Sequence, residues 1–195
     1  MTRTRLIAIV APLLVLLTAC GINSVPRAQE EAKARWADVQ ADLQRRADLI
    51  PNLVATVRAA AAQERNVLRE VVEARASASR VQLTGDQLTD PQAMARFGEA
   101  QARVTVALER LREAYPELQS NRNYETLMVQ LEGSDSRVAR KRELYNHAVQ
   151  EYNTLIRTFP SSIGARIIHG AEPLVPFQAD EAAQSAPRVD FGNGS

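Results

Sequence analysis

Apolar residues recur at spacings of three and four from Arg27 to Phe159, and this pattern constrains the fold more than any other feature of the sequence. The stretch contains only three glycines and three prolines, and it shows neither the alternation nor the β-branched runs that strands need. Spacings of three and four place apolar side chains on one face of a helix. We therefore predict an all-α protein.

Four apolar stripes divide this stretch into four expected helices. The stripes fall within residues 36–50, 53–71, 97–115 and 124–159. Short connections make consecutive helices antiparallel, so we expect an antiparallel up-down four-helix bundle of long helices.

The junction between the first two stripes contains the motif Asp48 to Pro51. Asp48 can cap the second helix and place Pro51 in its first turn, where the missing N–H of proline costs nothing. We therefore expect a helix break here. The alternative is a single long helix that is kinked at Pro51.

The later junctions contain proline as well. Residues 77–90 are expected to form a loop, which ends in a helix start at Asp90 and Pro91. Tyr115 is expected to end the third helix, because a residue that precedes proline avoids the α region of backbone space.

The N-terminus has the composition of an export signal. Two arginines among the first five residues, an apolar run over residues 6–17 and small residues before Cys20 are typical of a secretory signal peptide. Cys20, the only cysteine, occupies the position that is acylated in a bacterial lipobox. An uncleaved membrane anchor is the alternative, but the 14 residues of 6–19 are short of the ~20 that cross a bilayer. We expect residues 1–19 to be a lipoprotein signal peptide.

These signals divide the chain into four expected parts. After the signal peptide, residues 20–27 are expected to form a lipidated N-terminus and linker, followed by the helical bundle over 28–159. Four prolines after Phe159 prevent a long helix there. We expect residues 160–195 to be an extended tail that is partly docked on the bundle and frayed after Asp190.

Several segments match a known family in order. Residues 45–54 read RRADLIPNLV, and 113–118 read EAYPEL. Tyr-Asn pairs follow at 145–146 and 152–153, and PRVDF ends the series at 187–191. Together these segments resemble the LemA family of bacterial envelope proteins. The resemblance implies a helical bundle that is attached to a membrane at its N-terminus and faces the outside of the cytoplasm. It implies no activity, cofactor or catalytic residue.

Three polar residues of the first family segment form a candidate cluster: Arg46, Asp48 and Asn52. They can mark a helix boundary, where Asp48 is the cap and Arg46 pairs with it. The alternative is a polar recognition corner at the membrane-distal end of the bundle, close to Tyr115.

The two Tyr-Asn pairs are a second candidate. Tyr145 and Tyr152 fall on the apolar stripe of the last helix, and Asn146 and Asn153 fall beside it. Asparagine near a helix seam can fix its register, while a buried tyrosine ring needs a partner for its hydroxyl. The alternative is a ligand groove between helices.

Glu64 also falls on an apolar stripe, where an unpaired carboxylate is costly. We expect a buried salt bridge with Arg140 or Arg142. Acid–base chemistry at Glu64 would need a second group and a pocket, which the sequence does not reveal.

Composition excludes several functional classes. The formal net charge of +1 gives no field for nucleic acid, and two histidines without a His-x-x-x-His spacing argue against zinc. We expect no enzyme, metal or cofactor, but a scaffold for an envelope or membrane protein. The alternatives are a bundle that binds a lipid or small ligand and, third, a hydrolase.

Replacement of Cys20 tests the lipid anchor. Cys20→Ser should abolish acylation, because serine lacks the thiol that carries the acyl chains, and should release or mislocalise the protein. Intact mass and membrane fractionation in the native host measure both effects. Unchanged membrane attachment would favour the uncleaved anchor.

Overall fold

A computed structural model describes residues 23–60 and 65–178, and all regular structure in these ranges is helical. The prediction of an all-α protein is confirmed for them. Cys20 and Glu64 lie outside the described residues, as does the end of the tail from 179 to 195. The helices are α2 (Ser24–Ala60), α3 (Arg65–Arg80), α4 (Pro91–Ala114), α5 (Arg122–Leu155) and α6 (Ser161–Ile167), with the 3-10 helices η1 (Gly85–Thr89) and η2 (Pro116–Ser120).

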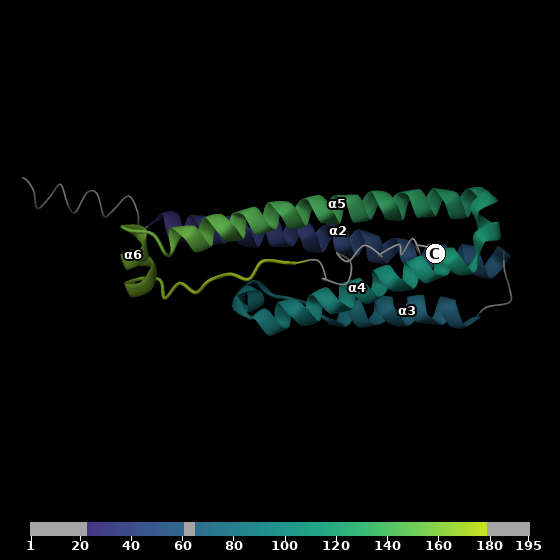
Figure 1. The fold of residues 1–195 in the computed structure, drawn as a ribbon, viewed down its shortest axis with the longest axis horizontal. Coiled ribbons are helices and arrows are strands. Elements are labelled where there is room, and N and C mark those ends of the chain that lie inside the picture. Colours follow the sequence, from purple (N-terminus) through teal and green to yellow (C-terminus); the bar gives the residue numbers. More distant parts are fainter. Residues whose placement is uncertain (1–22, 61–64, 179–195) are drawn as a thin grey trace, which may run out of the picture.

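The two longest helices, α2 and α5, pack against each other along most of their length (Figure 1). Arg46 of α2 pairs with Asp135 of α5 at 3.0 Å, and Asp38, two turns earlier in α2, pairs with Lys141, later in α5, at 2.9 Å. Because partners advance in opposite directions, the two helices are antiparallel. At 1.5 Å per residue, α2 is ~55 Å long.

A shorter pair of helices, α3 and α4, lies along one side of this long pair (Figure 1). The connection between α4 and α5 lies at one end of the rod, and α6 lies at the other, beside the start of α2. The chain therefore begins its first described helix and ends its last one at the same end of the molecule.

The predicted helix break at Asp48 is wrong, because α2 continues through Pro51 to Ala60. The alternative of one helix through Pro51 agrees with the structure at this junction, but the second stripe is not part of one rod with the first, because Leu68 and Val71 lie in the separate helix α3. Buried α2 positions repeat at spacings of three and four across the proline without a change of phase: Trp36, Val39, Leu43, Arg46, Ile50, Leu53 and Val57. Uninterrupted burial on one face favours a continuous helix over a break.

Pro51 leaves one carbonyl of α2 without its helical donor. Proline has no N–H, so the carbonyl of Ala47, four residues earlier, loses its usual partner. Arg75 of α3 supplies the missing donor, because its Nε lies 2.7 Å from that oxygen. The proline is therefore accommodated by a hydrogen bond from a neighbouring helix.

The other expected helix boundaries are largely confirmed. α4 starts at Pro91, with the Asp90 carboxylate accepting from the N–H of Gln92 at 2.8 Å, and it ends before Tyr115. The loop expected over 77–90 is shorter, because α3 continues to Arg80. α2 also begins earlier than expected, at Ser24 within the expected linker 20–27.

The apolar interior consists of two clusters. The first, which we call the α6-side core, is centred on Trp36 and Tyr145, whose ring centroids are 5.1 Å apart. The second, the far core, includes Ile50, Leu111 and Tyr124. Polar residues of α2 and α5 occupy the positions between these clusters.

The sequence predicted an extended tail after Phe159. In the structure, the C-terminal part is not extended throughout. Residues Ser161–Ile167 form the short helix α6, and only residues 171–178 run without regular structure back along the bundle. Ala165 is 1 % exposed, which shows that α6 is packed on the end of the rod.

Paired substitutions test the accommodation of Pro51. Arg75→Met should lower the free energy of unfolding by about 1–2 kcal/mol, because the Ala47 carbonyl loses its donor. In a Pro51→Ala background the amide of residue 51 can serve instead, so the same change should cost less than about 0.5 kcal/mol. Denaturant unfolding of the four chains measures this coupling.

The matched control is Arg69→Met on the same helix, since Arg69 is exposed and bonds to Asn66 within α3. Its cost should be small in both backgrounds. Equal costs of Arg75→Met with and without Pro51 would contradict the accommodation.

Candidate functional site

Arg46 is buried at the middle of α2, with a relative exposure of 5 %. Its guanidinium donates to Asp135 Oδ1 of α5 at 3.0 Å and to Gln101 Oε1 of α4 at 3.1 Å. It also donates to the Gln101 carbonyl and to Thr105 Oγ1, both at 3.3 Å. One side chain therefore joins three helices.

A second buried group lies one turn earlier on α2. Asp42 is 8 % exposed, and its Oδ1 lies 3.4 Å from Arg137 Nε of α5. The Ser134 hydroxyl, fully buried, donates to the Asp42 carbonyl at 3.4 Å. We call Asp42, Arg46, Ser134, Asp135 and Arg137 the polar layer, because along α2 and α5 they lie between the α6-side core and the far core.

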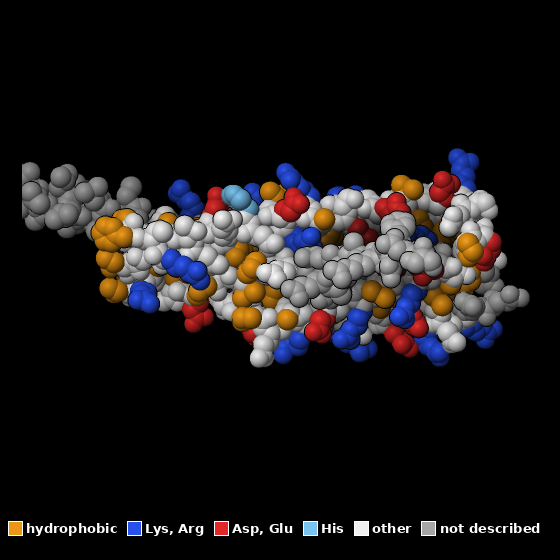
Figure 2. All heavy atoms as spheres, viewed as in Figure 1, with side chains coloured by type: hydrophobic (Ala, Val, Ile, Leu, Met, Phe, Trp, Pro, Cys, Tyr) orange, Lys and Arg blue, Asp and Glu red, His pale blue; other side chains and the backbone are white. Residues whose placement is uncertain are grey.

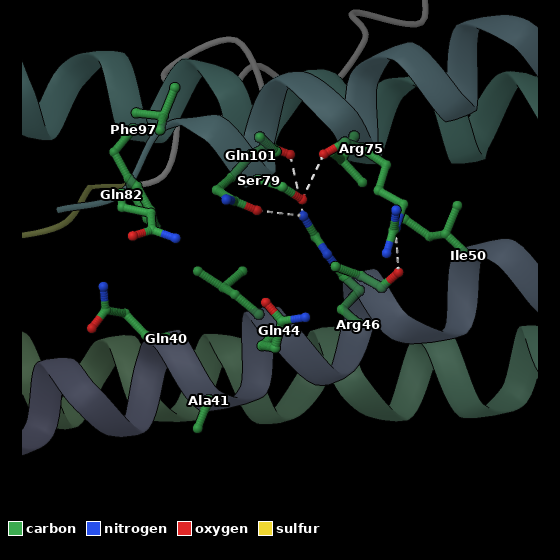
Figure 3. A pocket seen from close by; sticks show the side chains of 15 residues that line it. Gln40, Ala41, Gln44, Arg46, Ile50, Arg75, Ser79, Gln82, Phe97 and Gln101 are labelled. Carbon is green, nitrogen blue, oxygen red and sulfur yellow. Dashed lines mark hydrogen bonds between the residues drawn. The ribbon is translucent and has the colours of Figure 1, made fainter.

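A cavity of about 400 Å³ borders the polar layer between α2, α3 and α4 (Figure 3). In Figure 3, Gln40 and Gln82 extend from opposite sides of it. Six lining side chains are amides or guanidinium groups: Gln40, Gln44, Gln82, Gln101, Arg46 and Arg75. Such donors suit the oxygens of a small anion or polar ligand.

The asparagines of the two Tyr-Asn pairs bind the backbone of the C-terminal segment. Asn153 donates to the Leu174 carbonyl at 2.8 Å and accepts from the Leu174 N–H at 2.9 Å. Asn146 makes the same two bonds to Phe177, at 3.0 and 2.8 Å. Each side-chain amide thus pairs with the N–H and the carbonyl of one residue, as a neighbouring strand would. We call this pair of asparagines the amide clamp.

The spacing of the amide clamp suits an extended chain. Seven residues of α-helix rise ~10.5 Å from Asn146 to Asn153. Three residues of extended backbone, from Leu174 to Phe177, span ~10 Å. One heptad of α5 therefore matches three residues of the bound segment.

The remaining polar backbone groups of this segment are largely bonded. Val175 donates its N–H to the Leu88 carbonyl of η1 at 2.8 Å, and its own carbonyl accepts from the Tyr145 hydroxyl at 2.8 Å. Pro176 has no N–H to satisfy. Every N–H from residue 174 to 177 is thus paired, so the segment belongs to the fold.

The buried tyrosines of α5 differ in whether their hydroxyl groups form a hydrogen bond. Burial raises the pKa of Tyr145, which keeps its hydroxyl protonated as a donor to Val175. Burial also raises the pKa of Tyr152, and the nearby Glu172 adds to this rise. The hydroxyls of Tyr152 and Tyr124 are buried without a hydrogen bond to any part of the chain that the structure describes.

Comparison with known proteins decides the family. A family model described as "LemA family" matches residues 35–191, which is most of the chain. The chain belongs to the LemA family. A search of curated proteins found no significant match.

The first predicted site of this LemA protein is not assembled as expected. Arg46 is buried against α4 and α5, whereas Asp48 is exposed and accepts from Gln44 at 2.7 Å. Asp48 is therefore not the cap of a second helix. Asn52 is exposed one turn further along α2. Because α2 continues through Pro51, these residues lie along a helix instead of at a bundle corner.

Tyr115 does not join this cluster either. It is 3 % exposed at the end of α4 and packs in the far core. Ten residues of helix, or ~15 Å, separate it from Thr105, which Arg46 contacts. The structure therefore brings together Tyr145, Asn146 and Asn153 but separates Arg46 from Tyr115.

The prediction for Glu64 lies outside the described residues. Of its two suggested partners, Arg140 lies 3.2 Å from Glu143 on its own helix.

Sequence reasoning missed the partners that make these sites. Arg75 and Gln101 were not singled out, although Arg75 falls within an EARA segment shortly before the end of α3. A stricter heptad count through Pro51 would have placed Arg46 at a core position, in register with Val39 and Leu53. Such a position predicts that the arginine is buried and that its guanidinium requires hydrogen-bond or ion-pair partners.

The described residues limit the available chemistry. They contain no group of three or more His, Cys, Asp or Glu side chains that could hold a metal ion. None of the helices they form is both long and apolar enough to cross a membrane. Their most elaborate polar contacts, the polar layer and the amide clamp, join one part of the chain to another.

A single-atom change in the amide clamp tests its role. Asn153→Asp should lower the free energy of unfolding by about 1–3 kcal/mol, because a carboxylate oxygen would then face the Leu174 carbonyl without a donor. The amides of residues 174–177 should exchange faster with deuterium than in the parent chain. Thermal unfolding and hydrogen exchange measure these effects.

Asn123→Asp is the matched control, since Asn123 is exposed in the first turn of α5, where a negative charge is tolerated. It should leave the exchange of residues 174–177 unchanged. Parent-like exchange in Asn153→Asp would show that the clamp does not hold the segment.

Proposed function

We propose that this LemA protein is a membrane-tethered helical scaffold of the bacterial cell envelope that presents its outer surface to a protein partner. The observation that carries the proposal is the internal use of its polar groups. Arg46, Asn146 and Asn153 all bond to other parts of the same chain. A rod with such a locked interior is suited to holding other molecules in place.

The proposed tether lies close to one end of the rod. Cys20 stands four residues before Ser24, at which α2 begins. Acyl chains on Cys20 would anchor that end, since a lipobox protein carries at least two and such anchors are stable. The rod then carries its opposite end up to ~55 Å from the anchor.

A surface hollow of about 560 Å³ between α3 and α4 is the proposed contact surface. Small side chains such as Ala74, Ser77 and Ala102 line it, together with Val106, which is 47 % exposed. Small residues allow a partner helix to approach closely. Acidic and basic side chains are mixed along this side of the molecule (Figure 2), which suits a partner of mixed charge.

In-cell photo-crosslinking tests the scaffold. A photoreactive amino acid at Val106 should trap an envelope or membrane protein as an adduct of defined mass. The control position is Val129 on α5, which is 62 % exposed but lies outside the hollow. Mass spectrometry of the adducts identifies the partner. The same diffuse adducts from both positions, or none from either, would contradict the proposed surface.

A second candidate function is the binding of a small polar or anionic ligand, which the cavity beside Arg46 favours. Arg46, Gln40 and Gln44 already donate to the chain itself, so the donors left for a carboxylate or phosphate group are the terminal nitrogens of Arg75 and the amides of Gln82 and Gln101. Native mass spectrometry of the purified chain separates the two candidates, because only ligand binding leaves a retained small molecule. The described residues give no specific support to the hydrolase.

A further inference from the structure

Four large apolar side chains are exposed at the end of the rod where α5 passes into α6. Phe159 is 82 % exposed and Ile167 79 %, and beside them Ile168 is 58 % and Ile163 54 % exposed. Figure 2 shows hydrophobic side chains gathered at this end. We call these four residues the α6 tip. The other large apolar side chains exposed among the described residues stand singly on α3, α4 and α5.

The α6 tip is held in place by the fold. Ser161, at the start of α6, donates to the Leu155 carbonyl at 2.7 Å, and the Ala171 N–H donates to the Ala165 carbonyl at 2.9 Å. Ala165, on the inner side of α6, is 1 % exposed. Ile163 and Ile167 therefore face outward from a packed helix, and Phe159 and Ile168 are exposed just before and after it. Such exposure of apolar side chains is costly in water and calls for an apolar partner.

Exposed arginines accompany the apolar residues of the α6 tip. Arg157 precedes Phe159 by two residues and Arg166 lies between Ile163 and Ile167; both are exposed, and no aspartate or glutamate occurs from residue 152 to 171. Arg27 is exposed in the first turn of α2, which contains no acidic residue. Glu151 and Glu172 are the carboxylates directly before and after this range. Apolar residues with a basic rim match the surface of a bilayer that contains anionic lipid.

The position of the α6 tip also favours a bilayer as its partner. α6 contacts α2 at the end where α2 begins (Figure 1). The sequence that leads into α2 contains the apolar run 6–17 and Cys20. The patch thus lies on the end of the rod from which a membrane anchor would extend.

We propose that the α6 tip is a membrane-docking surface, which inserts its four apolar side chains into the interface of an anionic bilayer beside the lipid tether. The proposal rests on the membrane tether of the proposed function. A lipid tether alone gives the rod one point of attachment, whereas a second contact at the same end restricts its orientation. The docked rod projects its α4–α5 connection away from the bilayer.

Site-specific fluorescence on the full chain tests the docking. Ile167→Cys is labelled with an environment-sensitive dye, and the chain is reconstituted through its tether into vesicles of phosphatidylethanolamine and phosphatidylglycerol. Val129→Cys is the matched control, because Val129 is also exposed but lies 26 residues, or ~39 Å of helix, from Leu155. The parent chain, treated in the same way, reports any free Cys20 thiol.

The dye at position 167 should shift to shorter wavelength and be quenched by a quencher attached to lipid tails, whereas the dye at 129 should do neither. Equal, unquenched spectra at both positions in vesicle-bound protein would overturn the proposal. A blue shift at 167 without lipid-borne quenching would also overturn it, because that result indicates contact with a second copy or another protein.

Further variants of the labelled chain measure how much single apolar and basic side chains contribute to docking. Phe159→Ser should lower the ratio of docked to undocked protein roughly tenfold or more, because a large apolar side chain is lost from the interface. Arg157→Gln and Arg166→Gln should each lower it roughly fivefold, but only in vesicles with phosphatidylglycerol. The control Arg140→Gln, on the exposed side of α5, should leave it unchanged. Equal ratios in all variants would overturn the proposal.

The tether and the docking surface fail in different ways. A missing tether appears in the intact mass as a chain without acyl groups. A missing docking surface appears as an unquenched dye at position 167 in a chain whose mass shows the acyl groups.

Discussion

Removing an arginine side chain from water is costly, and Arg46 lies at the centre of the rod with a relative exposure of 5 %. Its guanidinium is compensated only when α4 presents Gln101 and α5 presents Asp135 at the same level. A shift of either helix by one turn would leave a buried charge unpaired, at a cost of several kcal/mol. The polar layer therefore fixes the register in which the two apolar clusters are assembled.

The helical content and several helix boundaries follow from the sequence alone. The Asp90 cap and the end of α4 at Tyr115 depend on local chemistry, which a single chain segment already contains. Whether α2 continues through Pro51 does not follow from the sequence alone. Whether a proline breaks a helix or lies within it depends on the partners available to the Ala47 carbonyl, and Arg75 comes from another helix. The heptad positions Val39, Arg46 and Leu53, which continue across Pro51 without a break, are the sequence signal for a continuous helix.

The amide clamp illustrates what sequence patterns leave open. The sequence pattern singled out the two Tyr-Asn pairs, and their spacing placed the asparagines beside the apolar stripe of α5. An amide can bind a neighbouring helix, a ligand or a passing backbone with equal ease, so its partner depends on the path of residues 171–178. The segment of this LemA protein is bonded on both edges, to α5 and to η1, which makes it a structural part of the rod.

The clamp contacts the chain through peptide groups and leaves side-chain identity to the pockets for Leu174 and Phe177. The amide clamp therefore constrains the number of residues between Leu174 and Phe177 more strictly than it constrains their side chains. Replacing Val175, which is partly buried between the two clamped residues, should preserve these bonds, because they use only backbone groups of residues 174 and 177. Inserting or deleting one residue there moves a peptide unit by ~3.3 Å and leaves one asparagine facing the wrong atoms. Over evolutionary time, this stretch is therefore expected to accept substitutions while resisting insertions and deletions.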